Sequence, residues 1–440
     1  MTIIRLPTEI RLMSSFKSIS GTFDILPEGH TSGGDSIAPS RIWQHAEAAI
    51  RKVMGMYGAE EIRTPILEPT ELISRGIGQL TDIVSKEMFA FERGDTHYVL
   101  RPEVTAPVMR AYQQHHLDQK GGVQRLFYIG PCFRAERPQK GRYRQFHQFG
   151  LEIIGATDAR ADAETIACAV DVYRELGLND FTIRLNSLGD SESRPRYKEA
   201  LIAYITPFAD QLSEVSRNRL ETNPMRILDT KIEKEREMLR GAPILADFLD
   251  DESRQHHEEV KAHLTSIGLT FQDDPFLVRG LDYYSRTAFE IESDSLGAQG
   301  SLAGGGRYDL LSLELGAKQI IPAVGFAAGM ERLIMALDAA NLIDIPSPRL
   351  DAFIVALGDA ALSWTFPMAH SLRENGIKVG YDLKGRSMKA QMREASRQNA
   401  KFVIIVGEDE LVAGAAQVKD MDQSSQRSVP FDQLASQLTN

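Results

Sequence analysis

The chain has 440 residues, 42% hydrophobic and 25% charged, which is the composition of an ordinary globular protein with two or three domains. Its net charge of -11 excludes nucleic-acid binding by overall electrostatic attraction, so any RNA contact must be local. The two cysteines, Cys132 and Cys168, lack the spacing of a disulfide framework or a zinc site. Because we find neither a secretory signal nor a membrane-spanning run, we expect a cytoplasmic protein.

The first part of the chain predicts a mostly antiparallel α+β domain. Residues 1–16 precede the first recognisable element, and we expect them to be a poorly ordered extension. Apolar residues at helical spacing predict an amphipathic helix over 42–57, and the stretch 61–67 looks like an edge strand because Pro65 cannot donate to a ladder. Further strands are expected at 96–100, 125–129, 145–154, 181–185, 286–291 and 301–302. They do not alternate regularly with helices, which argues against a doubly wound sheet.

The second half of the chain changes character twice. Residues 190–265 are rich in charged, helix-favouring stretches and predict a helical insertion. Pro346 and Pro348 then mark a linker. Beyond it the sequence predicts strands at 352–357, 378–382 and 402–406 and helices at 361–375 and 387–399. This alternation indicates a small α/β domain over 351–440.

One loop concentrates positive charge in this acidic protein. Residues 133–148 contain five cations against Glu136, namely Arg134, Arg137, Lys140, Arg142 and Arg144. Guanidinium groups present planar forks that match phosphate oxygens, so the loop is a candidate clamp for a polyphosphate or an RNA backbone. A solvated turn with surface ion pairs is the alternative, which fits a single arginine better than five cations in one loop.

Three other segments carry candidate site residues, each with a plain structural alternative. Arg279, Tyr283 and Tyr284 suit a pocket or an ordinary strand, and the glycine triplet at 304–306 predicts a turn. Small residues at 325–329 are expected to open a helix with Arg332 about two turns in. Neither a P-loop nor a Rossmann fingerprint is present, and the histidines form no ligand cluster.

Together these segments resemble the class II aminoacyl-tRNA synthetases. Residues 61–68 resemble their motif 1, residues 133–136 motif 2 and residues 325–332 motif 3. Four further segments are similar to histidyl-tRNA synthetases, at 81–88, 100–105, 279–284 and 303–309. The resemblance implies an antiparallel-sheet catalytic domain over 17–345 with the helical insertion inside it, followed by a C-terminal α/β anticodon-binding domain.

The resemblance also implies a reaction in which ATP is a substrate. The histidine carboxylate would attack the α-phosphate of ATP, and histidine would then pass to the 3′ end of tRNA(His). Arg134 would hold the α-phosphate and the carboxylate, Arg332 the γ-phosphate, and Arg279 the α-phosphate in a role that other class II enzymes give to a metal ion. Arg142 is a further ATP-binding candidate, Mg²⁺ is expected on the outer phosphates, and Phe146 or Phe133 is a candidate for stacking adenine.

For histidine itself, the resemblance assigns a site with two ends. Glu103 and Thr105 would receive the ammonium group and Gln148 the carboxylate side. Glu152, Tyr284 and Tyr308 would bind the imidazole. The predicted histidine site is completed by Tyr283, Arg134 and Arg279. A carboxylate and a phenol satisfy the two ring nitrogens of a neutral imidazole.

The implied partners are L-histidine, ATP, tRNA(His) and a second copy of the chain in a homodimer, without DNA or membrane. Arg137 and Lys140 are candidate contacts to the acceptor stem. Lys389, Arg393 and Arg397 share a helical face that suits RNA phosphates, although a solvated helix face explains them almost equally well.

Two alternatives stay open at this point. A synthetase-like regulatory subunit of ATP phosphoribosyltransferase shares the catalytic fold, but such proteins typically lack the C-terminal domain and have eroded site residues. Here Arg134, Arg279, Arg332 and residues 351–440 are all present. A class II synthetase for another amino acid is disfavoured by Tyr283, Tyr284 and Glu152.

Overall fold

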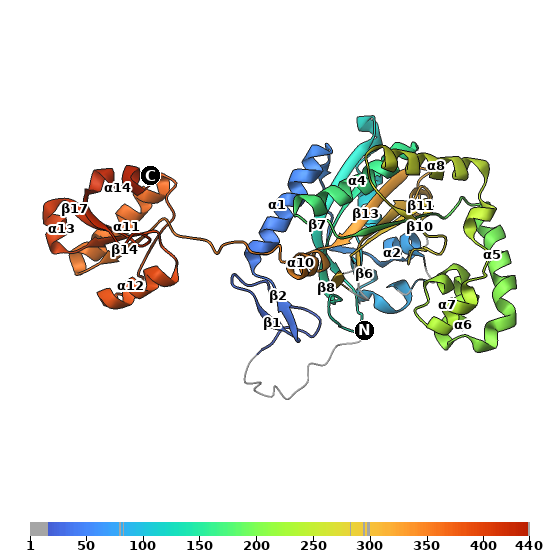
Figure 1. Ribbon diagram of the computed structural model, residues 1–440, viewed down its shortest axis with the longest axis horizontal. Helices are drawn as coiled ribbons and strands as arrows, with labels where there is room; N and C mark the ends of the chain where they lie inside the picture. The colour runs from blue at the N-terminus through green and yellow to red at the C-terminus, as the bar shows by residue number, and fades with distance from the viewer. Residues whose placement is uncertain are drawn as a thin grey trace. The chain divides into compact units, whose positions relative to one another are not determined.

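The chain folds into two compact units with a boundary between Asp344 and Ile345 (Figure 1). The computed structural model describes residues 16–78, 81, 83–281, 283–293, 295–296 and 300–438. The expected N-terminal extension, except for Phe16, lies outside the described residues, as do Asp82 and Asp282 of two motif segments. Each unit has its own hydrophobic core.

A large twisted sheet organises the first unit. Within the described residues its strand order is β10-β9-β11-β12-β13-β8-β7-β3. Neighbouring strands are antiparallel except for the two edge pairs, β10 with β9 and β3 with β7. The strands are β3 (Glu60–Glu61), β7 (Gln124–Phe133), β8 (Gln145–Ile154), β9 (Thr182–Ser187), β10 (Gln272–Asp273), β11 (Ser285–Glu292), β12 (Ser301–Arg307) and β13 (Ala323–Gly329). The predicted antiparallel α+β fold is therefore confirmed.

Three helices support the centre of this sheet. The predicted amphipathic helix is α1 (Ser40–Met56), which buries Ile42, Ala46, Ile50 and Val53 on one face. It packs against α4 (Ala159–Glu175) and α10 (Met330–Ala339), and both of these contact β8 and β13. Burial of each isoleucine or valine side chain contributes about 1.5–3 kcal/mol, so α1 fixes α4 and α10 behind the strands that carry the site.

Smaller elements complete the first unit. A hairpin, β1 (His30–Ser32) with β2 (Asp35–Ile37), precedes α1, and a three-stranded sheet has the order β4-β6-β5. Figure 1 shows α5, α6 and α7 of the insertion gathered at one end of the unit. The bounds are β4 (Leu67–Pro69), β5 (Phe89–Arg93), β6 (Thr96–Leu100), α2 (Thr70–Ile77), α3 (Thr105–Gln114), α5 (Ser193–Ile205), α6 (Glu214–Thr222), α7 (Glu233–Leu239), α8 (Asp251–Ser266) and α9 (Leu311–Glu314).

Three predicted elements of the first unit are wrong. The stretch 61–67 is not one strand, because β3 ends at Glu61 and β4 begins at Leu67, with Pro65 between them. The glycine triplet is no turn but the centre of β12. Residues 325–329 likewise belong to β13, so that Arg332 lies in the first turn of α10 and not two turns into a helix. Two of these strand glycines leave room for a side chain of the candidate site, Gly304 for Arg279 and Gly325 for Glu152.

The second unit is built on a five-stranded sheet with the order β15-β14-β16-β17-β18 within the described residues. β14 is parallel to both of its neighbours, and the last two strands are antiparallel. The bounds are β14 (Ala352–Ala356), β15 (Val379–Tyr381), β16 (Phe402–Val406), β17 (Ala415–Asp420), β18 (Gln426–Pro430), α11 (Asp359–Glu374), α12 (Met388–Arg397), α13 (Glu408–Ala413) and α14 (Leu434–Leu438). The predicted alternation is confirmed as far as β16, whereas the final hairpin was not predicted.

Each unit contains one of the two tryptophans of the chain. Trp43 of α1 is buried and lies edge-on to His147 at 5.3 Å between ring centroids. Trp364 of α11 packs on Phe431 at 4.6 Å. Among the described residues, no helix combines the length and the apolar character needed to cross a bilayer.

Candidate functional site

A cavity of about 200 Å³ in the first unit gathers side chains from segments that are far apart in the sequence. Its walls come from the start of α3, the loop between β7 and β8, the segment before β11, and β12 with the start of α10. The predicted site residues in its lining are Glu103, Thr105, Arg134, Arg142, Gln148, Arg279, Tyr283, Tyr284 and Arg332. Glu152 and Tyr308 lie beneath them and are almost completely buried.

Three arginines converge on one end of the cavity. Arg134 donates to the Pro102 carbonyl oxygen at 3.0 Å and lies over the Phe146 ring, and Arg332 donates to the Ser301 carbonyl oxygen at 2.9 Å. Burial, followed by the positive charges of Arg142 and Arg134, lowers the pKa of Arg332. Glu136 pairs with Arg142 at 2.7 Å and with Arg134 at 3.9 Å, so the three positive charges outnumber the carboxylate that pairs with two of them and this end suits a polyphosphate.

Arg279 lies flat on the sheet between this cationic end and the tyrosines. Its guanidinium carbon is 5.8 Å from the centre of the Tyr284 ring, and Nη1 is 3.6 Å from the Glu290 carboxylate. Burial acts to lower the pKa of Arg279, but the Glu290 charge raises it, so the group stays cationic. Nε is buried and has no hydrogen-bond acceptor among the described residues.

The opposite end of the cavity is built around a buried carboxyl group. Glu152 accepts hydrogen bonds from the Tyr308 hydroxyl and, at 2.7 Å, from the Thr105 hydroxyl. Burial raises the pKa of Glu152 to about 8. The carboxyl group lies over Gly325 of β13, where a Cβ atom would overlap Oε2, so glycine at 325 leaves the space that it occupies.

Two further polar groups are fixed before any ligand binds. The Glu103 carboxylate accepts from the backbone N–H groups of Thr105 at 2.8 Å and Ala106 at 3.0 Å, which caps the start of α3. Gln148 Oε1 accepts from the Cys132 thiol at 3.3 Å. Each oxygen keeps a free lone pair, so both side chains retain capacity for a ligand donor.

Comparisons with known proteins identify the family of the chain. A family model described as "Histidyl-tRNA synthetase" matches residues 37–333, and one described as "Anticodon binding domain" matches residues 351–440. The chain belongs to the histidyl-tRNA synthetase family. A "Histidine--tRNA ligase" of Chloroherpeton thalassium is 50% identical over 417 residues, which cover 93% of this chain and 95% of that protein.

Solved structures of histidyl-tRNA synthetases share the architecture. The crystal structure of apo S. aureus histidyl-tRNA synthetase is 36% identical with a TM-score of 0.80, over 97% of this chain and all of that one. A Bacillus halodurans C structure titled "ATP phosphoribosyltransferase regulatory subunit/histidyl-tRNA synthetase" is 23% identical with a TM-score of 0.61, over 89% of this chain and 98% of that one. At that identity the second likeness shows the fold alone.

Some acidic residues at this candidate site were not among the predicted site residues. Glu136 pairs with Arg142 at 2.7 Å, and Glu290 with Arg279 as described. Glu331 accepts from the His147 backbone N–H at 2.9 Å and contacts its ring Nδ1 at 3.0 Å, which ties the motif 3 helix to β8. The only sequence signal was that Glu136 and Glu331 each lie close to a predicted arginine.

Other predicted residues lie outside the cavity. Arg137 and Lys140 are exposed on the loop between β7 and β8 and do not line the cavity. Of the two candidate adenine-stacking rings, Phe146 lines the cavity and Phe133 does not. The exposed pair remains open to a large partner, which is the kind of contact that the sequence predicts for it.

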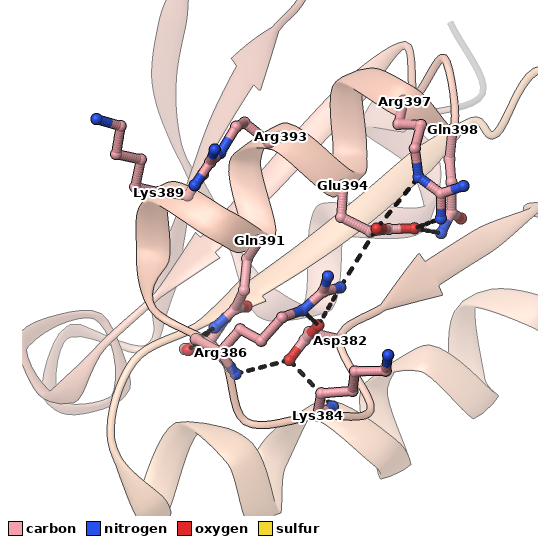
Figure 2. A network of polar contacts seen from close by, with 10 residues as sticks. Asp382, Lys384, Arg386, Lys389, Gln391, Arg393, Glu394, Arg397 and Gln398 are labelled. Atoms are coloured by element: carbon pink, nitrogen blue, oxygen red, sulfur yellow. Dashed lines mark hydrogen bonds and ion pairs between the residues drawn. The ribbon is translucent and has the colours of Figure 1, made fainter.

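In the anticodon-binding domain, the cations of α12 divide into two groups (Figure 2). Arg397 of α12 and Arg386, which precedes the helix, both pair with the Glu394 carboxylate, and the Arg397 hydrogen bond lowers the pKa of Glu394 to about 2. Lys389 and Arg393 project together to the other side, and the described residues offer neither an ion-pair partner. The predicted set of Lys389, Arg393 and Arg397 therefore differs in its ion pairing: Arg397 is paired with Glu394, and the other two have no such partner among the described residues.

Proposed function

We propose that this chain is a histidine–tRNA ligase that forms histidyl-adenylate from L-histidine and ATP and then esterifies tRNA(His). In the first step a histidine carboxylate oxygen attacks the α-phosphorus of ATP, and the bond to the bridging oxygen breaks to release pyrophosphate. In the second step the terminal ribose 3′-hydroxyl attacks the carbonyl carbon, and AMP and a proton leave. The observation that carries the proposal is one cavity lined by three arginines, with the buried Glu152–Tyr308 pair beneath its lining, where Thr105 connects the pair to the cavity.

The cationic end fits the phosphate chain and the developing negative charge. We assign Arg134 to the α-phosphate and the histidine carboxylate, and Arg332, with Arg142 beside it, to the outer phosphates. Arg279 lies between the two ends and would stabilise the charge that grows on the α-phosphate. Fixed cations in a half-buried site act strongly because they need no reorganisation during the reaction.

The buried end fits the imidazole ring. Glu152, oriented by the hydrogen bond from Tyr308, would accept from one ring nitrogen, and the Tyr284 hydroxyl would donate to the other, while Tyr283 packs beside them at 5.7 Å from the Tyr308 ring. Glu103 and Thr105 would receive the ammonium group and Gln148 the carboxylate side. Such a site rejects apolar isosteres, because they would leave buried polar groups unpaired.

Magnesium fits this site as a companion of ATP. The described residues contain no group of three or more His, Cys, Asp or Glu side chains suited to a metal ion. The ion would therefore be held mainly by the phosphate oxygens, where it supplies charge neutralisation for the leaving pyrophosphate.

The tRNA would contact both units. Arg137 and Lys140 are exposed and would contact the acceptor end, and Lys389 and Arg393 of α12, which have no ion-pair partner among the described residues, would contact the tRNA from the anticodon-binding domain. As a translation enzyme the protein would act in the cytoplasm, where its tRNA is.

The second protomer of a homodimer is the proposed occupant of an apolar surface near motif 1. Ile66 and Leu67 are each 42% exposed and Phe91 is 46% exposed. Phe91 stacks on Tyr98 of β6, the strand that pairs with β4, so the four side chains belong to one small sheet and its approach. Burial of such an exposed apolar patch against its own copy would form a two-fold interface. Sedimentation at micromolar concentration is expected to give a dimer.

Histidine-dependent exchange of pyrophosphate into ATP tests the catalytic proposal. Exchange is expected with histidine and not with the other amino acids as controls. A regulatory subunit of ATP phosphoribosyltransferase would bind histidine without exchange, and that result would overturn the proposal.

A further inference from the structure

A buried ion pair lies behind the proposed imidazole site. Arg307 is the last residue of β12, is fully buried, and forms an ion pair with the equally buried Asp162 of α4. Its Nη1 also donates to the Ala156 carbonyl oxygen at 2.8 Å and to Asp309 Oδ1 at 3.2 Å. Because successive residues of an extended chain point to opposite faces, Arg307 lies on the side away from Tyr308, the next residue.

Two connections therefore join β12 to β8, although β13 lies between them. On the side of the cavity the Tyr308 hydroxyl reaches Glu152 of β8 over Gly325. On the other side Arg307 reaches Ala156 and Asp162, which follow the end of β8.

The middle strand is held as well. Asp309 Oδ1 accepts from the Ala323 backbone N–H of β13 at 2.9 Å, and the Tyr308 N–H donates to the Ala323 carbonyl oxygen at 2.8 Å. The residues on both sides of Tyr308 are thus tied down, which leaves its backbone little freedom.

The charges in this cluster are fixed. Burial acts to lower the pKa of Arg307, but Asp162 and Asp309 raise it. The pKa of Asp162 is lowered, since Arg307 and His256 outweigh the effect of its burial. A buried ion pair adds little net stability, and its best-attested use is to fix one geometry among several.

We propose that Arg307 is a positioning residue for histidine selection, which sets the Tyr308 hydroxyl against Glu152 from the opposite face of the sheet. The inference rests on the proposed function, because it takes Glu152 and Tyr308 as the imidazole-binding pair. Arg307 would touch neither substrate. Loss of its planar fork lets the end of β12 shift, and small displacements of a binding group reduce activity strongly.

Two substitutions test this role without removing a site residue. Arg307→Lys keeps the charge but loses the bidentate fork, and Asp309→Asn weakens the ion pair while keeping an acceptor for the Ala323 N–H. In the exchange assay both are expected to raise KM for histidine about tenfold, the scale of a hydrogen bond to a charged group, with KM for ATP unchanged. If the lysine variant does not fold, the asparagine variant carries the test.

The matched control is Arg125→Lys. Arg125 of β7 pairs with Glu164 of the same helix α4 at 3.1 Å, outside the cavity. Its KM for histidine is expected to stay at the wild-type value. An equal rise of KM for histidine in this control would mean that weakening any contact between α4 and the sheet impairs histidine binding. That result would overturn the specific role of Arg307.

A double-mutant cycle with Tyr308→Phe decides whether Arg307 acts through Tyr308. Once the hydroxyl is gone, Arg307→Lys is expected to raise KM for histidine no further, since coupled residues are not additive. Additive effects would overturn the inference while leaving the proposed function intact. If Tyr308→Phe alone leaves KM for histidine unchanged, the imidazole assignment of the proposed function is wrong instead.

Discussion

Gly304 lies directly beneath the guanidinium group of Arg279, so closely that a side chain at residue 304 would overlap both Nη atoms. Gly304→Ala is therefore expected to displace Arg279 rather than the backbone, because the far end of an arginine is free to move. Adenylate formation should fall by about 10² or more, the scale for loss of a preorganised electrostatic group, with little change in the melting temperature.

Gly305→Ala is the matched control for this substitution. At residue 305 a Cβ atom would meet the Gly325 carbonyl oxygen and the Phe289 ring, which are backbone and core. This variant is expected to lose stability first. If Gly304→Ala melts as early as the control, the glycine at 304 serves packing and not the placement of Arg279.

Arg279→Ala tests the charge itself. Pre-steady-state adenylate formation is expected to slow by about 10² or more. Single-turnover transfer from preformed histidyl-adenylate to tRNA should slow less. In that step AMP is the leaving group, and no bond to the α-phosphorus forms or breaks. A well-folded variant that forms adenylate at the wild-type rate would remove Arg279 from the mechanism.

Glu152→Gln should separate the two substrates. The neutral amide accepts an imidazole N–H less strongly than a carboxylate does, so KM for histidine is expected to rise well above any change in KM for ATP. Glu164→Gln, on the helix side and outside the cavity, is the control. Unchanged KM for histidine together with unchanged kcat would contradict the assignment.

The raised pKa of Glu152 predicts that histidine binding releases a proton. At pH 7 a group with a pKa of about 8 is mostly protonated, whereas an imidazole N–H calls for the carboxylate form. Calorimetry in two buffers of different ionisation enthalpy should therefore show a release of up to about one proton near pH 7, and none well above pH 8. Glu152→Gln should abolish the difference between buffers. If the wild-type protein gives equal heats of binding in both buffers, Glu152 is already ionised in the empty site.

The same shift has a defined sign for stability. Since the folded state holds the proton more tightly than the unfolded chain does, the contribution of Glu152 is most favourable below its ordinary pKa. It weakens as the pH rises toward 8.

The division of cations on α12 predicts different salt dependences. Removal of a phosphate-binding side chain lowers the slope of log K against log salt by about 0.7 for a single-stranded contact. Arg393→Ala is expected to do so in tRNA(His) binding, and Arg397→Ala is not, because Arg397 is neutralised by Glu394. Both variants should retain pyrophosphate exchange. Equal slopes in the two variants would contradict the division.

Periodic elements were readable from the sequence, and close contacts were not. The helix α1 follows from its apolar spacing alone, and β8 and β16 were predicted with the bounds that the structure shows. The triplet 304–306 was misread because glycine at a turn and glycine under a side chain look alike in sequence. The difference lies in Arg279, whose guanidinium group lies over Gly304 only in the folded protein.

The candidate site residues were assigned through resemblance rather than through spacing. Arg134, Arg279 and Arg332 line one cavity as expected, but their acidic neighbours Glu136 and Glu290 were not identified. Charged residues are common on any surface, so their pairing becomes visible only when three-dimensional distances are known. The buried ion pair of Arg307 with Asp162 was not predicted because the two residues lie 145 positions apart in the sequence.

The distribution of tryptophans makes each half of the molecule separately visible in fluorescence. A Trp43→Phe variant leaves only Trp364, and a Trp364→Phe variant leaves only Trp43, so denaturation curves of the two variants report the two units one at a time. Trp43 carries further information, because Phe23 packs beside it and also contacts Tyr143 of the arginine-rich loop. We therefore expect its emission to change when ATP or tRNA moves that loop, so that no attached dye is needed.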